Sequence, residues 1–113
     1  MTLTWSDWLR HLRHDLVKRL VWPARDRRDF GATPRAGELR AYLVDDEGKP
    51  ATAAKIWAKL KATAANPQHP ALVTFEHALD EAVAAAQCDD VDGVLALEPA
   101  FDRLAQDLAG EKG

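Results

Sequence analysis

The sequence predicts an all-α fold, a small bundle of four to five helices. Several segments carry apolar residues at intervals of three and four, which is the spacing of one face of an α-helix. Stretches rich in proline, glycine and charge separate these segments, and 47% of the 113 residues are hydrophobic while 29% are charged. This length and composition fit one folded domain over residues 1–113, and we expect residues 1–3 and 110–113 to be frayed.

The first predicted helix has the clearest apolar face. Its members are Trp5, Trp8, Leu9, Leu12, Leu16 and Leu20. Thr4 or Ser6 offers a side-chain oxygen that caps the free N–H groups at the start of the helix. Pro23 lacks an N–H and disfavours helix at the preceding residue, so we expect this helix to end near Val21. Residues 23–33 are then expected to form a charged loop.

The segment that follows is open to two interpretations. Thr33 and Pro34 form a helix-start signal, a cap followed by a proline. Leu39 and Leu43 lie four residues apart, which favours a helix, but alternate apolar positions also fit a short strand near residues 39–44. Periodicity alone does not separate the two in so short a run, and helix is the favoured interpretation.

A turn and a firmer helix come next. Residues 45–50 read Asp-Asp-Glu-Gly-Lys-Pro, which is typical of a turn. The helix expected after this turn has Ala53, Ile56, Trp57, Leu60 and Ala64 on its apolar face. Pro67 and Pro70 prevent that helix from continuing.

The remainder of the chain predicts two more helices. One apolar face comprises Leu72, Phe75, Leu79, Val83 and Ala86, and the other comprises Val91, Val94, Leu97, Phe101, Leu104 and Leu108. Pro99 lies within the second face, so it either kinks that helix or starts a new one. From all these faces we expect a shared core that includes Leu12, Leu16, Trp57, Leu60, Leu79, Val83, Phe101 and Leu104.

Charge is distributed unevenly along the chain. Residues 1–40 hold nine Lys and Arg against five Asp and Glu, whereas residues 66–113 hold two against ten. The favoured interpretation is that the basic and acidic segments face each other within the bundle. The alternative is that each end of the chain meets a different partner.

Two polar groupings resemble metal sites only in part. Asp7, His11 and His14 share one helix face at a spacing that fits a metal ion, but a fourth ligand is missing and we expect a solvated face. The acidic stretch before Gly93 resembles a calcium loop, but Cys88 and Pro99 occupy positions that need oxygen ligands. We therefore expect no metal and no cofactor, and interpret the acids as favouring a helix start.

No catalytic motif is present in the sequence. Cys88 lacks the surroundings of a known nucleophile and is expected to be a small buried hydrophobe. A single cysteine fits a reducing compartment, the first residues do not resemble a signal peptide, and no apolar run is long enough for a membrane span. We expect a cytoplasmic protein that is not an enzyme.

Aromatic and basic residues gather near the N-terminal third. Trp and Arg are the side chains that most often anchor protein interfaces. The residues that we single out as partner-binding are Trp5, Trp22, Arg25, Arg27 and Arg28. For Trp5 and Trp22 a place in the core or at its edge fits equally well. We expect helix one and the following segment to form the edge that contacts another protein.

The C-terminal part, from Phe75 to Leu108, resembles the helical hairpins of small bacterial chaperones and adaptors, such as the flagellar export chaperones. The shared feature is a helix that ends in alanine and aspartate, followed by a second helix with the sequence Leu-Ala-Leu-Glu-Pro-Ala-Phe at residues 95–101. This resemblance covers about a third of the chain and implies a chaperone-like role.

Three functions are weighed on this basis. The favoured one is a non-enzymatic accessory or adaptor protein that binds another protein. The second is a nucleic-acid-associated regulator, because the basic segment 10–28 carries aromatic neighbours that stack on bases. The third is an enzyme whose site has no recognisable motif.

Overall fold

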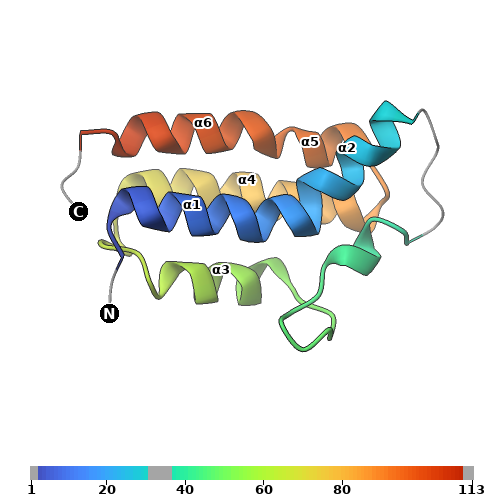
Figure 1. Cartoon of the computed structure of the whole chain (residues 1–113), viewed down its shortest axis with the longest axis horizontal. Coiled ribbons are helices and arrows are strands. Elements are labelled where there is room, and N and C mark those ends of the chain that lie inside the picture. The colour runs from blue at the N-terminus through green and yellow to red at the C-terminus, as the bar shows by residue number, and fades with distance from the viewer. Residues whose placement is uncertain (1–2, 31–36, 111–113) are drawn as a thin grey trace.

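Four helical rods lie side by side and alternate in direction along the chain (Figure 1). The structure, a computed structural model, describes residues 3–30 and 37–110, so the helix start predicted at Thr33–Pro34 lies outside the described residues. The elements are α1 (Trp5–Leu16), the π-helical turn η1 (Val17–Val21), α2 (Trp22–Asp29), the 3₁₀ turn η2 (Arg40–Tyr42), α3 (Ala53–Lys61), α4 (Pro70–Gln87), α5 (Val91–Leu95) and α6 (Leu97–Leu108). The all-α prediction is confirmed, because the described ranges contain no strand.

Side-chain caps fix where most of the rods begin. Thr4 accepts a hydrogen bond from the N–H of the third residue of α1, and Thr52 does the same for α3, each at 3.2 Å. The imidazole of His69 accepts the N–H of Ala71 at the start of α4. Asp90 accepts the N–H of Gly93 at 3.1 Å, which confirms that the acids near residue 90 start a helix.

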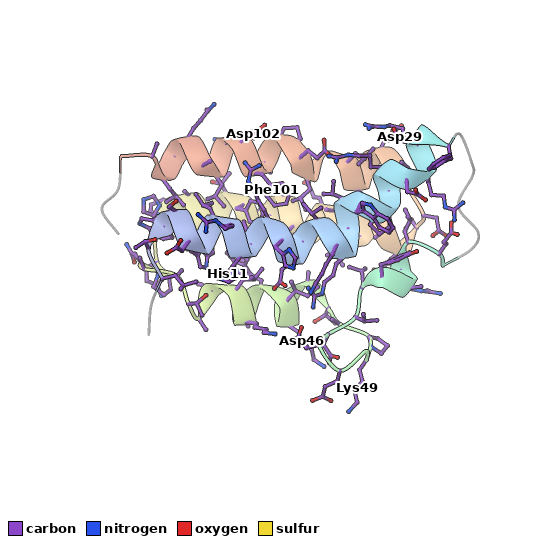
Figure 2. The ribbon with its side chains drawn as sticks, in the orientation of Figure 1. His11, Asp29, Asp46, Lys49, Phe101 and Asp102 are labelled. Atoms are coloured by element: carbon purple, nitrogen blue, oxygen red, sulfur yellow. The ribbon has the colours of Figure 1, made fainter. Side chains whose placement is uncertain are left out.

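A chain of aromatic rings joins the four rods. Trp8 of α1 lies 6.3 Å from Trp57 of α3, centroid to centroid. Trp57 lies 5.7 Å from Phe75 of α4, and Phe75 lies 5.7 Å from Phe101 of α6. The indole N–H of Trp8 also donates to the carbonyl of Leu60 at 2.8 Å, which satisfies its only polar group in the core. Figure 2 shows Phe101 on the side of α6 that faces α1 and α4.

The core predicted from the apolar faces is confirmed. All eight of its members are buried, within one continuous cluster that draws on every rod. The N–H of Leu3 donates to the carbonyl of Thr63 at 3.1 Å, which links the start of the first rod to the end of α3. Among the described residues no helix is both long and apolar enough to cross a membrane.

The first rod does not end before Pro23, and this prediction is wrong. At η1 the helix widens, and the N–H of Trp22 donates to the carbonyl of Val17, five residues earlier. A proline ring inside an α-helix clashes with the carbonyl four residues before it. The wider turn accommodates that ring, and Pro23 occupies the first turn of α2, where its missing N–H matters least. The expected loop is therefore helical as far as Asp29.

The segment expected to be helix or strand at 39–44 is neither. Arg40–Tyr42 form one 3₁₀ turn, and Val44 makes an isolated antiparallel bridge to Pro50. Gly37 adopts a φ of +75°, outside the helical region, and a turn begins at residue 45, so only one helical turn fits between them. The turn predicted over residues 45–50 is present, and the loop carrying Asp46 and Lys49 projects beyond α3 (Figure 2).

The last rod consists of two helices rather than one. α5 ends at Leu95, and α6 starts at Leu97, so Pro99 lies in the first turn of a new helix. This is the second of the two outcomes that the sequence allowed, a new helix rather than a kink. Cys88 corrects another expectation, because its side chain is exposed at the end of α4 instead of buried.

Candidate functional site

Trp22 is the exposed tryptophan of the molecule. Its side chain is 55% exposed, whereas Trp5, Trp8 and Trp57 are all buried. The neighbours Val21 and Pro23 are buried on the opposite side of the helix. Because η1 and α2 continue α1 without a loop, the indole is held at the surface by rigid helix rather than by a flexible segment.

A shallow hollow of about 350 Å³ lies beside this indole. One face of the first rod forms its lining, which consists of Arg13, His14, Val17, Lys18 and Trp22. Three of these residues carry basic side chains and none is acidic. The hollow therefore combines an apolar floor, an aromatic edge and positive charge.

A second hollow of about 360 Å³ adjoins the first. Its lining includes Lys18, Tyr42 and Val44, together with Asp45 and Asp46. Lys18 lines both hollows, so its side chain lies between the hollow beside Trp22 and the hollow beside Tyr42. The hydroxyphenyl ring of Tyr42 is exposed, as is the indole of Trp22.

Buried Arg19 ties this surface to the rest of the fold, and sequence reasoning missed it. Its side chain is only 8% exposed and donates to the carbonyl of Val44 at 2.7 Å. The same guanidinium pairs with the carboxylates of Asp15 and Asp46, each at 3.2 Å. Asp46 also pairs with Lys59 of α3. We call these groups the Arg19 network, and it fastens the loop at residues 44–46 to η1.

Lys18 is the surplus cation at the edge of this network. Its ammonium lies 3.7 Å from Asp15, but Asp15 is already paired with Arg19. The two carboxylates of the network thus face three cations, namely Lys18, Arg19 and Lys59. The side chain of Lys18 is 50% exposed, and exposed pairs of this kind stabilise little. Lys18 is therefore available to an incoming anion.

The arginines of α2 are engaged within the chain. Arg25 pairs with Glu98 of α6, and Arg27 pairs with Glu38 at 2.5 Å. Arg28 contacts the adjacent Asp29 at 3.2 Å, and both side chains are half exposed. None of these arginines lines the hollow beside Trp22. The residues predicted to bind a partner thus fall into two groups. Trp22 borders the hollow, whereas the three arginines of α2 are paired with carboxylates elsewhere.

The charge pattern follows the favoured interpretation in two places. Arg13 of α1 pairs with Asp102 of α6 at 3.2 Å, and its guanidinium carbon lies 5.5 Å from the ring centroid of Phe101. Arg25 and Glu98 make the second pair between the basic first rod and the acidic last rod. Opposite charges of the first and last rods therefore do meet, at the surface of the bundle.

Trp5 is not at the surface with Trp22. It is 4% exposed and packs edge-on against Trp8 at 5.5 Å and against His69 at 5.8 Å. Trp5 lies at the start of the first rod and Trp22 lies toward its other end. Trp5 serves the core, and we leave it out of the candidate surface.

Asp89 and Asp45 are further polar clamps that the sequence did not reveal. The carboxylate of Asp89 accepts the N–H of Gly37 at 2.7 Å and the N–H of Leu39 at 3.3 Å. Asp45 accepts the N–H of Lys49 at 3.0 Å and the N–H of Glu47 at 2.9 Å. These hydrogen bonds, that of Lys49 foremost, lower the pKa of Asp45 below its ordinary value of 3.8.

The weak metal candidates lie at the solvent side of α1. His11 and His14 are exposed, and Asp7 lies 3.9 Å from Arg10, a cation that competes with any metal. In the part of the chain that the structure describes, no three His, Cys, Asp or Glu side chains are grouped in a way that would hold a metal ion. Exposed Cys88 belongs to no such group.

Comparisons of the chain with protein-family models, with curated proteins and with solved structures find no match. The resemblance of residues 75–108 to chaperone hairpins therefore rests on the sequence pattern alone. In the structure α4 and α6 pack against each other in antiparallel directions (Figure 1).

Proposed function

We propose that this protein is a non-enzymatic accessory or adaptor protein of chaperone-like type, which binds a partner protein through the surface around Trp22. The observation that carries the proposal is the half-exposed indole, fixed on continuous helix beside a hollow with an apolar floor. Tryptophan is enriched among interface anchors, because it buries a large area at little cost in side-chain entropy.

The surroundings of Trp22 favour a protein partner over nucleic acid. Phosphate binding relies on cations that are free to face the backbone of the nucleic acid. Arg13, Arg25 and Arg27 instead face carboxylates of the same chain, which weakens the positive field of the basic segment. The net charge of −3 acts in the same direction. The exposed thiol of Cys88 fits a reducing compartment, in keeping with a cytoplasmic role.

Capture from an extract of the native host tests the proposal with a matched pair of variants. Trp22→Ala removes the anchor, and Val73→Ala removes a side chain of nearly equal exposure, 53%, on α4. We expect Trp22→Ala to weaken capture of one or more proteins about tenfold, as loss of an anchor does, and Val73→Ala to leave it unchanged. Quantitative mass spectrometry of the captured proteins, after nuclease treatment, gives the ratio.

Two results would contradict the proposal. The first is equal capture by the wild type and Trp22→Ala. The second is capture that disappears on nuclease treatment and falls steeply with salt, which would identify the surface as a nucleic-acid site.

A further inference from the structure

We propose that the occupant of this surface is a segment of a partner protein in which acidic residues stand between two apolar residues. The proposal rests on the proposed function, because it specifies what the Trp22 surface binds. It follows from the two adjoining hollows, from their shared lysine and from the charges that line each of them.

The aromatic rings at both ends determine the apolar part of this pattern. Trp22 borders one hollow and Tyr42 borders the other, and both side chains are exposed. Val17 and Val44 contribute aliphatic surface beside them. Apolar side chains seated in both hollows would remove this surface from water, which is the main favourable term in association. An occupant that spans both hollows needs two such side chains.

Lys18 determines the acidic part of the pattern. It lies between the hollows, and the network behind it already satisfies Asp15 through Arg19. A carboxylate of the occupant would give the ammonium of Lys18 a second partner, beside Asp15, at a site where one wall is apolar. Such an ion pair sets register and selects against partners of the wrong charge.

The charges that line the two hollows also determine toward which hollow the acidic residues of the occupant lie. The Trp22 hollow is lined by His14, Lys18 and Arg13, the last already paired with Asp102, and by no acid. The Tyr42 hollow includes Asp45 and Asp46. Carboxylates of the occupant are therefore favoured toward Trp22 and disfavoured toward Tyr42. The apolar residue seated by Tyr42 should be followed by neutral positions, because acids there would face the two aspartates.

Defined peptides test this proposal on the whole protein. The probe is an end-capped peptide with the core leucine–glutamate–glutamate–leucine, flanked by serine and glycine. Its matched controls replace both glutamates by glutamine, or both leucines by alanine, and a thymidine oligonucleotide is the nucleic-acid probe. Binding is measured by calorimetry and by the emission of Trp22, since the other three tryptophans are buried.

A pair of lysine variants isolates the contribution of Lys18. Lys18→Met keeps the aliphatic stem and removes the charge. Lys59→Met makes the same change at a lysine of the Arg19 network that lines neither hollow. We expect the glutamate peptide to bind at least about tenfold more tightly than either control peptide. Lys18→Met should abolish the preference for glutamate over glutamine, and Lys59→Met should retain it.

Several outcomes would overturn the inference. They are equal affinity of the glutamate and glutamine peptides, tighter binding of the oligonucleotide, equal effects of the two lysine variants, and failure of every peptide to bind. If extract capture depends on Trp22 while any of these results holds, the proposed function stands and only the acidic occupant is wrong. If capture does not depend on Trp22, the proposed function itself fails.

Discussion

The aromatic chain and the Arg19 network hold different parts of the same bundle by different forces. Around Trp8 and Trp57, the rods are joined by buried rings and by a single hydrogen bond to Leu60. Around Arg19, a loop is fastened to a helix by one guanidinium that contacts two carboxylates and a carbonyl. The first region gains stability from area removed from water, and the second from satisfying polar groups at partly buried positions.

This difference shows which part of the molecule can carry a binding surface without loss of folding stability. The aromatic chain leaves no ring free for a ligand, because each ring is already covered by the next. The Arg19 network fixes η1 and the loop at residues 44–46 while leaving Trp22, Lys18 and Tyr42 exposed between them. The surface that we propose as an interface is thus built on polar clamps rather than on the core.

The largest loss of stability is expected from a substitution that interrupts the aromatic chain. Trp8→Ala leaves a cavity next to Trp57 and removes the indole hydrogen bond to the carbonyl of Leu60, so the free energy of unfolding should fall by about 3–5 kcal/mol, the usual range for truncating a buried aromatic residue. Urea denaturation followed by circular dichroism measures the change. Trp22→Ala is the control, and as a surface substitution it should change stability by no more than about 0.5 kcal/mol. Similar values for the two variants would show that the rings do not hold the rods together.

An intermediate effect is expected in the Arg19 network. Arg19→Met should lower the free energy of unfolding by about 1–3 kcal/mol, because the carbonyl of Val44 and the carboxylate of Asp15 lose their donor. Arg19→Lys should rescue little, since one ammonium cannot reproduce the fork of a guanidinium.

The loss at Arg19 should be local, and amide hydrogen exchange tests this. Exchange should quicken at Asp45 and Ala51, whose N–H groups close the loop by bonds of 2.8 and 3.0 Å to the carbonyls of Lys49 and Leu43. The amides of α4 should keep their protection relative to global stability. Uniform acceleration along the chain would mean that Arg19 supports the core as a whole.

The smallest expected effect concerns the Asp45 turn and its dependence on pH. The folded turn lowers the pKa of Asp45, so the turn is stabilised above the ordinary value of 3.8 and loses that stabilisation as pH falls through the lower, folded value. In an NMR titration the amide shifts of Glu47 and Lys49 should change with a midpoint below pH 3.8. Asp45→Asn should remove this transition without altering the core. A midpoint at or above the ordinary value would show that the turn does not favour the charged carboxylate.

Periodicity explains why the core was predictable. Apolar side chains at Leu79 and Val83, or at Phe101 and Leu104, lie on one helix face by spacing alone. The start of the first helix was readable for a similar reason, because a cap such as Thr4 acts on backbone three residues away. Local and periodic signals of this kind need no knowledge of the tertiary structure.

The candidate site was only partly predictable, because its signals are neither local nor periodic. Trp22 was identified by residue type, but the same argument selected Trp5, which the structure buries against Trp8 and His69. Exposure depends on what another rod covers, and the sequence of one rod does not contain that information. Arg19 and Asp89 were missed because their partners lie 25 to 52 residues away along the chain.

The sequence by itself therefore determined the helical class, the start of the first helix and the eight core residues, since hydrophobic burial and capping act through spacing along one chain. The tertiary structure alone decided that the first rod passes through Pro23, because a wider turn at η1 relieves the clash that proline causes in a regular helix. The tertiary structure also decided that Trp22 is exposed to solvent and that Lys18 is only weakly paired. Both depend on the groups that distant segments bring to the same place, and on how completely those groups neutralise or cover one another.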